Sequence, residues 1–398
     1  MTTKNEHNKI NVPNLRFPEF QGEWEKCKLE DVMNFSTTRI NSSELNEDNY
    51  VSTENMLQDY QGIMEAKSVP EDVNVISYSC GDILISNIRP YLKKVWKATF
   101  NGGCSSDVFV LKANDNIESD YLHYVIANDK FINFVMSGAK GVKMPRGDKK
   151  QMKTYSLSLP QIQEQKKIGK MLSLLDERIA AQNKIIDKLQ SLIKGLNNHL
   201  HQQCVNEIET SFADLGVSYS GLSGKTAADF GSGKPFITYL NVYSNNVIDE
   251  TSYQYVRMDN NEKQSIVRYG DVLFTLSSET PEEVGIGSVY LGNQEVYLNS
   301  FCFGIHITNT QKAFSPYLSY YISTAQFRKF IYPFAQGSTR FNLCKADFEK
   351  ATFKLPTLEN QERIYKALKS LSDKIMVEKA TLEQYSRQKQ YLLRQMFI

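Results

Sequence analysis

Two stretches rich in arginine and lysine hold the side chains most able to bind a ligand through charge. Residues 83–106 contain four basic side chains and no acidic one, with Tyr91 and Trp96 among them. Residues 130–153 contain seven basic side chains and one acidic side chain. Arginine and lysine in loops bind phosphate groups, and Arg, Asn, Ser and Thr also contact base edges. Either stretch alone could be a solvated charged surface, but two of them in a chain of net charge +1 favour nucleic acid binding.

The matching segments of the second half carry fewer basic side chains. Acidic residues Glu279, Glu282 and Glu283 stand there instead. We therefore expect the two halves to recognise different targets. In the first half, the candidate contact residues are Asn87, Arg89, Tyr91, Lys93, Lys94, Lys140, Lys143 and Arg146. In the second half they are Lys225, Ser277, Ser278, Thr280, Ser338, Thr339, Arg340 and Asn342.

The sequence offers no arrangement of residues typical of catalysis or metal binding. A Walker-type phosphate loop, GxGxxG after a strand and HExxH are all missing, as is the Asn-Pro-Pro-aromatic motif of DNA methyltransferases. Asp59, Glu65 and Lys67 weakly resemble the carboxylate–lysine set of nucleases, but Glu-x-Lys is common by chance. Residues 221–226 end like a phosphate loop but lack a preceding strand. We expect no catalytic residue, no metal and no cofactor bound by this chain.

The chain contains two copies of one unit, each about half its length, and these copies carry the candidate residues. Leu159-Pro160 and Leu355-Pro356, 196 residues apart, each open a long helical run. At this offset Ile168 matches Ile364, and further apolar positions follow. The apparent helices at 119–136 and 315–331 also match. Repeats spaced this widely are duplicated domains, and a duplicated chain suits a target with two half-sites.

Each long helix has a heptad pattern, with apolar residues at alternating gaps of three and four. If a pseudo-two-fold axis relates the duplicated halves, the two helices must run antiparallel. Gln182 and Glu378 should then approach each other near the middle of the seam and fix its register. A helix over 161–203 would be about 64 Å long, so its length could set the spacing of the two half-sites. The residues expected to pair are Leu172, Leu175, Ile179, Gln182, Ile186, Leu189, Leu368, Leu371, Ile375, Glu378, Leu382 and Leu392.

These patterns predict an α+β fold with two tandem mixed α/β domains. Each domain is followed by a long helix, and the two helices form an antiparallel coiled coil with pseudo-two-fold symmetry. The expected segments are a first domain at 1–160, a central helix at 161–205, a second domain at 206–356 and a C-terminal helix at 357–398. Widely spaced cysteines and the lack of a long apolar run or an apolar N-terminal segment favour a cytoplasmic protein.

Several segments together resemble a known family. They are VPNLRFPEFQGEWEKCKLEDV, the Gly-Asp-Ile/Val-Leu strand of each half, the helix starts QEQKKI and NQERI, and QYLLRQMF. The chain resembles the specificity subunits of Type I restriction–modification systems over essentially its whole length. The resemblance implies two target-recognition domains that bind a bipartite, asymmetric DNA site, with residues 87–94 similar to a recurrent loop of one class of these domains.

The resemblance also implies partners. Such subunits do no chemistry and bind double-stranded DNA together with two methyltransferase subunits, which methylate adenine, and with restriction subunits. S-adenosylmethionine, ATP and Mg²⁺ are then expected on the partner subunits. Two alternatives stay open: a nuclease or methyltransferase component with an unrecognised site, and a coiled-coil scaffold protein with two binding heads that does not bind DNA.

Overall fold

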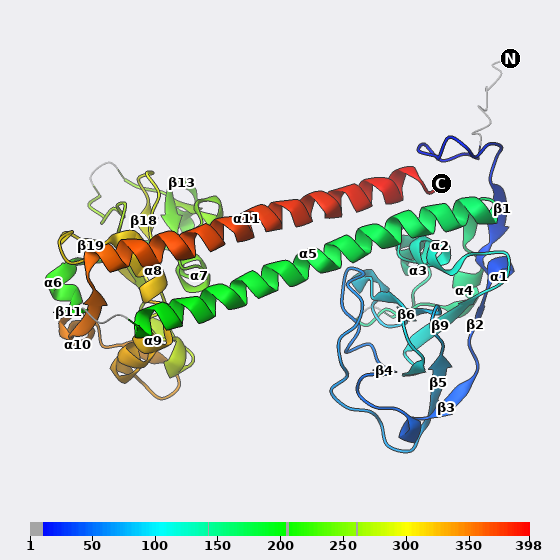
Figure 1. Ribbon diagram of the computed structural model, residues 1–398, viewed down its shortest axis with the longest axis horizontal. Helices are drawn as coiled ribbons and strands as arrows, with labels where there is room; N and C mark the ends of the chain where they lie inside the picture. The colour runs from blue at the N-terminus through cyan, green and yellow to red at the C-terminus, as the bar shows by residue number, and fades with distance from the viewer. Residues whose placement is uncertain (1–10, 142, 204–206, 260–261) are drawn as a thin grey trace, which may run out of the picture. The chain divides into compact units, whose positions relative to one another are not determined.

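The computed structural model describes residues 11–141, 143–203, 207–259 and 262–398. The chain forms two compact units (Figure 1). Unit 1 comprises Met1–Asn183 and Ala380–Ile398, and unit 2 comprises Lys184–Lys379. Helix α5 (Ile162–Gln202) and helix α11 (Leu358–Gln395) each contribute to both units. The units thus cut across the four segments expected from the sequence, and residues 204–206, at the expected end of the central helix, lie outside the described residues.

Unit 1 is built on two four-stranded sheets, ordered β2-β9-β6-β7 and β3-β5-β8-β4. Both faces of strand β6 are buried, which suits its three successive apolar residues Ile83, Leu84 and Ile85. Ile83 and Ile85 pack with the helices, and Leu84 packs with Val110 and Tyr78 on the opposite face. The strands are β1 (Glu25–Lys28), β2 (Met33–Phe35), β3 (Arg39–Asn41), β4 (Tyr50–Val51), β5 (Asn74–Tyr78), β6 (Ile83–Ser86), β7 (Val95–Lys97), β8 (Gly102–Cys104), β9 (Val108–Ala113) and β10 (Ser156–Leu159), with β1 paired to β10. The helices are α1 (Leu29–Val32), α2 (Ser119–Ile126), α3 (Asp129–Ser137) and α4 (Lys149–Lys153).

Unit 2 repeats this plan around the antiparallel sheet β12-β19-β15-β17. Val272 and Phe274 face one core, where they meet Phe327, and Leu273 faces the other. The strands are β11 (Glu207–Thr210), β12 (Gly216–Ser220), β13 (Phe230–Ile237), β14 (Gln254–Val256), β15 (Val272–Thr275), β16 (Ser277–Ser278), β17 (Gly287–Val289), β18 (Tyr297–Leu298), β19 (Cys302–Ile307), β20 (Ala335–Gln336), β21 (Phe341–Leu343) and β22 (Phe353–Pro356). The helices are α6 (Phe212–Leu215), α7 (Tyr239–Ser244), α8 (Ser315–Tyr321), α9 (Ala325–Ile331) and α10 (Lys345–Lys350).

The helices expected at 119–136 and 315–331 are each broken in two, so that prediction is wrong in detail. In unit 1 the Asn128 side chain accepts a hydrogen bond from Lys130 N and caps α3. In unit 2 the Thr324 hydroxyl accepts from Phe327 N and caps α9. In a continuous helix, each of these backbone N–H groups would donate to a carbonyl oxygen of the preceding turn. Here the capping side chain accepts the hydrogen bond instead, so a new helix begins.

Both long helices are fixed to their units by a glutamine at the same place in the repeat. In unit 1, Gln165 Nε2 donates to the carbonyl oxygen of Pro160 (2.8 Å) and its Oε1 accepts from Glu118 N (2.8 Å). In unit 2, Gln361 Nε2 donates to the carbonyl oxygen of Pro356 (2.7 Å) and its Oε1 accepts from Phe314 N (2.8 Å). These contacts confirm the duplication, because the same offset of 196 relates each partner.

The two long helices run in opposite directions within each unit. In unit 1 the start of α5 lies in one core with the end of α11, and Lys389 pairs with Asp176 at 2.6 Å. In unit 2 the end of α5 lies in one core with the start of α11, through residues such as Leu196 and Leu368. This is the antiparallel direction expected from a pseudo-two-fold axis between the duplicated halves. The red end of α11 and the start of green α5 can be followed in Figure 1.

The expected seam positions are buried or half-buried along both helices. Leu172, Gln182 and Ile186 are buried on α5, and Leu368 is buried on α11. The approach of Gln182 to Glu378 stays a prediction. Among the described residues, none of the helices is both long and apolar enough to cross a membrane.

Candidate nucleic-acid interface

In unit 1, the chain leaving β6 is joined to residues 139–147, which we call hairpin 1; residue 142 lies outside its described part. Gly147 N donates to Asn87 O (3.0 Å), and Arg89 N donates to Pro145 O (2.8 Å). Within the hairpin, Lys140 and Arg146 exchange two backbone hydrogen bonds of 3.1 and 2.9 Å. The fold therefore brings Asn87 and Arg89 close to Lys140 and Arg146, although more than fifty residues separate the two pairs in the sequence.

The two opposed cationic side chains of hairpin 1 are open to solvent. Lys140 is 81% exposed and Arg146 is 55% exposed. Each has one acidic neighbour: Lys140 pairs with Asp148 at 3.1 Å and Arg146 with Asp107 at 3.4 Å. Such exposed pairs contribute little to stability. Both cations can therefore exchange these neighbours for an anionic ligand at low energetic cost.

The basic loop beside hairpin 1 is held in a constrained conformation. Arg89 and Lys93 have φ values of 49° and 54°, in the left-handed region that side chains seldom adopt. Arg89 and Tyr91 are exposed, whereas Lys93 pairs with Asp129 at 2.9 Å. Lys94 Nζ donates to Thr53 O at 2.6 Å, and burial lowers its pKa. The structure thus presents Arg89 and Tyr91 outwards and turns Lys94 inwards; the DNA contacts of all four stay predictions.

Lys149, one of the basic residues of the stretch 130–153, packs against aromatic rings within unit 1. Lys149 Nζ lies over the rings of Phe109 (4.6 Å) and Phe35 (5.1 Å), and burial lowers its pKa. A cation over aromatic faces is stabilised where it lies. Lys149 therefore adds less to the exposed charge than its place in the basic stretch suggests.

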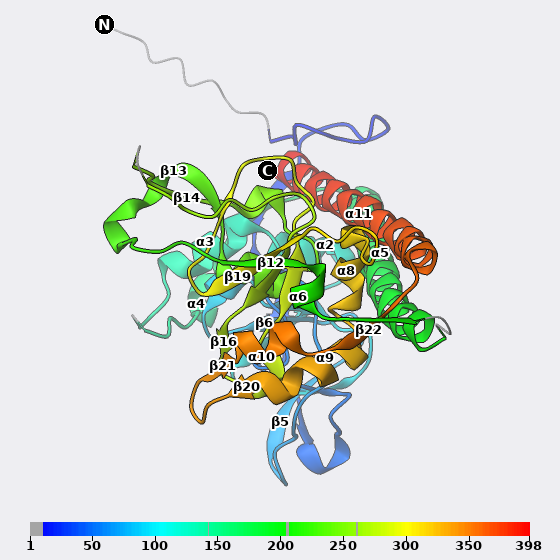
Figure 2. The ribbon, with the colours of Figure 1, turned by 90° about the vertical axis from the view of Figure 1, so that its left-hand side faces the viewer.

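Unit 2 contains an equivalent hairpin, residues 335–343, which we call hairpin 2. Its strands β20 and β21 form a sheet with β16, and Figure 2 shows the three side by side. Leu343 N donates to Leu276 O at 2.8 Å, matching the bond from Gly147 to Asn87 in unit 1. Gln336 lies opposite Asn342, just as Lys140 lies opposite Arg146.

Most of the candidate residues of the second half lie on or beside hairpin 2. Ser338, Thr339, Arg340 and Asn342 are exposed on it. Thr280, in the adjacent loop, is also exposed. Two further candidates, Ser277 and Ser278, lie on β16 and are buried. Gln336, which the sequence did not single out, is exposed and completes the set.

The two buried serines hold the site together. Ser277 Oγ accepts a hydrogen bond from Arg340 at 3.3 Å. Ser278 Oγ donates to Glu283 at 3.0 Å. Hydrogen bonds from Tyr243 and Ser278 lower the pKa of Glu283, so this carboxylate stays ionised and anchors the loop.

Lys225 lies on a different loop of unit 2, with contacts of its own. Its ammonium group pairs with Glu262 and donates to Arg257 O at 2.6 Å. Only 8% of its side chain is exposed. These contacts fasten the loop before β13, and a DNA contact by Lys225 stays a prediction.

Arg328 fixes the loop 279–285 beside hairpin 2, and sequence reasoning missed it. Its guanidinium donates to three carbonyl oxygens, of Glu282 (2.7 Å), Val284 (2.7 Å) and Gly285 (2.9 Å). Burial lowers its pKa. In sequence it is one more cation on an amphipathic helix, and the signal of its role is only visible once the loop is folded over it.

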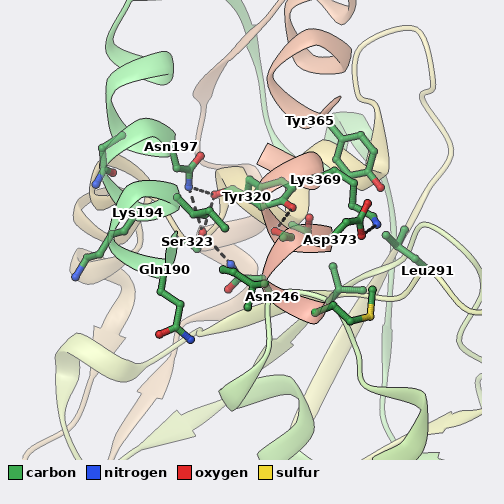
Figure 3. Close-up of a pocket in the computed structure, with 17 residues that line it drawn as sticks. Gln190, Lys194, Asn197, Asn246, Leu291, Tyr320, Ser323, Tyr365, Lys369 and Asp373 are labelled. Atoms are coloured by element: carbon green, nitrogen blue, oxygen red, sulfur yellow. Dashed lines mark hydrogen bonds and ion pairs between the residues drawn. The ribbon is translucent and has the colours of Figure 1, made fainter. Parts of the chain in front are cut away.

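A cavity of about 660 Å³ lies inside unit 2, between the end of α5 and the start of α11 (Figure 3). Asn197 donates to Tyr320 O at 2.9 Å, and the Tyr320 and Ser372 hydroxyls share a hydrogen bond of 2.8 Å. Lys369 and Asp373 form an ion pair on α11 at its edge. The exposed side chain of Met376 also lines the cavity. The cavity lining thus combines apolar side chains with polar groups, such as Asn197 and Tyr320, that already have hydrogen-bond partners.

Comparison with known proteins agrees with this geometry. The Type I restriction modification DNA specificity domain matches residues 21–191 and again residues 224–385. The chain is 25% identical over 356 residues to a Methanocaldococcus jannaschii protein named as the type I restriction enzyme MjaX specificity subunit. The match covers 81% of this chain and 79% of that protein. The MjaVIII specificity subunit of the same organism is 24% identical over 312 residues, 73% of this chain and 72% of its own length.

Two solved structures share the fold. The S subunit of a Type I system from M. genitalium superposes with a TM-score of 0.59 at 14% identity, covering 97% of this chain and 99% of that one. A chain from a structure that describes assembly and conformational transition of the type I R-M system has a TM-score of 0.56 at 17% identity, with coverages of 93% and 96%.

Two copies of one recognition unit, each with an exposed hairpin, define a duplicated DNA-binding protein. The chain belongs to the Type I restriction–modification DNA specificity family. Its role is recognition of a DNA sequence, as the resemblance noted in the sequence implies.

Proposed function

We propose that this chain is the non-catalytic specificity subunit of its complex and recognises a bipartite, asymmetric DNA site through hairpins 1 and 2. One observation carries the proposal. The two hairpins are held by equivalent backbone hydrogen bonds but carry different side chains, with Lys140 and Arg146 in one and Gln336 and Asn342 in the other. A shared scaffold with different contact residues fits two unlike half-sites.

The partners in this proposal are two methyltransferase subunits and, in the full complex, restriction subunits. Large apolar side chains are exposed along both long helices, namely Leu174, Ile185, Leu192, Met376, Val377 and Tyr391. A partner that covers these side chains would remove their apolar surface from water, which favours association. S-adenosylmethionine, ATP and Mg²⁺ would be bound by these partners, in the cytoplasm, and the methylated base would be adenine.

The proposal is tested by expressing the chain with its cognate methyltransferase subunit and mapping methylated adenines across a host genome. A single motif of two unlike half-sites around a fixed spacer, lost when this chain is omitted, is the expected result. Methylation that persists without the chain would contradict a specificity role. A stable complex whose DNA affinity does not fall with added salt would contradict phosphate contact.

A further inference from the structure

The side chains at equivalent positions of the two hairpins differ in chemical kind. Lys140 and Arg146 form a directly opposed pair on hairpin 1, and Gln336 and Asn342 form the same pair on hairpin 2. Directly opposed residues of an antiparallel ladder project from the same face. All four side chains are exposed. Each hairpin therefore offers one pair of hydrogen-bonding side chains side by side, cationic in unit 1 and neutral in unit 2.

The cationic side chains and the amide side chains suit different bases in the major groove. Guanine presents two acceptors, O6 and N7, which suit the donors of arginine or lysine. Adenine presents the N7 acceptor and the N6 amino donor, which suit the amide of asparagine or glutamine, since that group both donates and accepts. A cationic side chain cannot accept the adenine amino hydrogen, and an amide makes a weaker contact with guanine.

Neighbouring charges reinforce the difference. Arg340, the cation of hairpin 2, donates to Ser277 Oγ and lies over the Phe301 ring with 6.0 Å between its guanidinium carbon and the ring centroid. The nearby loop adds exposed carboxylates at Glu279 and Glu282. Asp107 and Asp148 flank hairpin 1 but leave Arg146 and Lys140 more than half exposed.

We propose that hairpin 1 reads guanine through Arg146, assisted by Lys140, and that hairpin 2 reads adenine through Asn342, assisted by Gln336. The inference rests on the proposed function, because it assumes that both hairpins face the DNA bases. It assigns to one half-site a G·C pair contacted by unit 1. It assigns to the other half-site an A·T pair contacted by unit 2, distinct from the adenine that is methylated.

Two variants of the full complex test this assignment by motif mapping. Asn342→Ala is expected to relax one A·T position in one half-site, with discrimination there falling about 5- to 150-fold. Arg146→Ala is expected to relax one G·C position in the other half-site by a similar factor. Asn293→Ala, an exposed asparagine of unit 2 outside the hairpin, is the matched control and should leave the motif unchanged. In each variant the unaffected half-site reports that the chain has folded.

A second measurement covers a variant whose methylation is too weak to map. Wild-type and variant complexes are titrated with duplexes in which single adenines are replaced by 7-deazaadenine, which lacks the N7 acceptor. One replacement should weaken wild-type binding and leave the affinity of the Asn342→Ala complex unchanged, since the two changes remove the same contact.

Three results would overturn the inference: relaxation of a G·C pair in Asn342→Ala, relaxation of an A·T pair in Arg146→Ala, or two unchanged half-sites. A further contrary result is that the base replacement and the Asn342→Ala substitution each weaken binding by an amount that is independent of the other at every adenine position. Such additive losses would also overturn the inference. A wild-type complex that yields no methylated motif would overturn the proposed function itself, and so is distinguishable from these results.

Discussion

The ring of Phe397 stacks on the ring of Tyr121, with centroids 5.2 Å apart and planes inclined by 21°. Met396 and Phe397 are buried in the core of unit 1, and Lys130 donates to Phe397 O. His201 stacks on Tyr317 at the equivalent place in unit 2, 5.3 Å between centroids. Each recognition unit is thus completed by the end of a long helix, and unit 1 is completed by the end of the described chain.

Truncating this ring should therefore destabilise unit 1. Phe397→Ala is expected to lower the free energy of unfolding by about 3–5 kcal/mol, as for other buried phenylalanines. Both tryptophans, Trp24 and Trp96, lie in unit 1, so their fluorescence during denaturant unfolding follows this unit alone. Ile398→Ala removes an exposed neighbour and should change little. Equal midpoints for both variants would show that Phe397 is not part of the core.

The stability of unit 1 should also fall in mild acid. Burial, with a contribution from Lys389, lowers the pKa of His123 to about 4. In the unfolded chain its pKa is about 6.5. The unfolded state therefore binds the proton first, so the free energy of unfolding contributed by this group decreases as pH falls from about 6.5 to 4. His123→Gln should flatten this part of the profile measured by tryptophan fluorescence, and an unaltered slope would contradict the assignment.

Removing the tether of loop 279–285 should affect one half-site only. Arg328→Met leaves three carbonyl oxygens without their donor, and we expect relaxed recognition of the half-site read by unit 2. Lys329→Met removes the same charge from the neighbouring exposed position and serves as the control. Motif mapping of both complexes checks this. Relaxation of both half-sites, or of neither, would argue against a local positioning role.

The helix pair is expected to act as a spacer between the half-sites. One heptad inserted after Gln182 and another after Glu378 would lengthen both helices by about 10 Å, close to three base pairs of duplex. The preferred spacer should lengthen, or binding should be lost. A complex that still methylates the original motif would show that helix length does not set the spacer.

Sequence patterns predicted the parts of this structure that depend on periodicity and repetition. The heptads of both long helices and the offset that relates Gln165 to Gln361 are visible in the sequence. The breaks at Asn128 and Thr324 were missed because a local cap outweighed a continuous apolar pattern. The pairing of Ile88 with Arg146 could not be predicted, since a bridge between such distant residues depends on the folded sheet.

Residue type alone identified most of the candidate contact residues, whereas their arrangement in space depends on the fold. Clustered basic residues marked Arg89, Lys140 and Arg146 as candidates in two separate stretches, and only the folded chain shows that these stretches lie side by side. Gln336 escaped notice because a lone glutamine has no distinctive pattern, and it gains meaning only opposite Asn342. Arg328 was missed because its hydrogen bonds are to the backbone of another loop, which no sequence pattern reveals.

Exchange of one hairpin tests most directly the claim that each hairpin reads its own half-site. Residues 335–343 are replaced by the sequence of residues 139–147, which has the same length, so that both units carry hairpin 1. Methylated motifs are then mapped for the complex. We expect an unchanged first half-site and a second half-site in which guanine replaces the adenine contacted by Asn342. A second half-site identical to that of the wild type would contradict the claim.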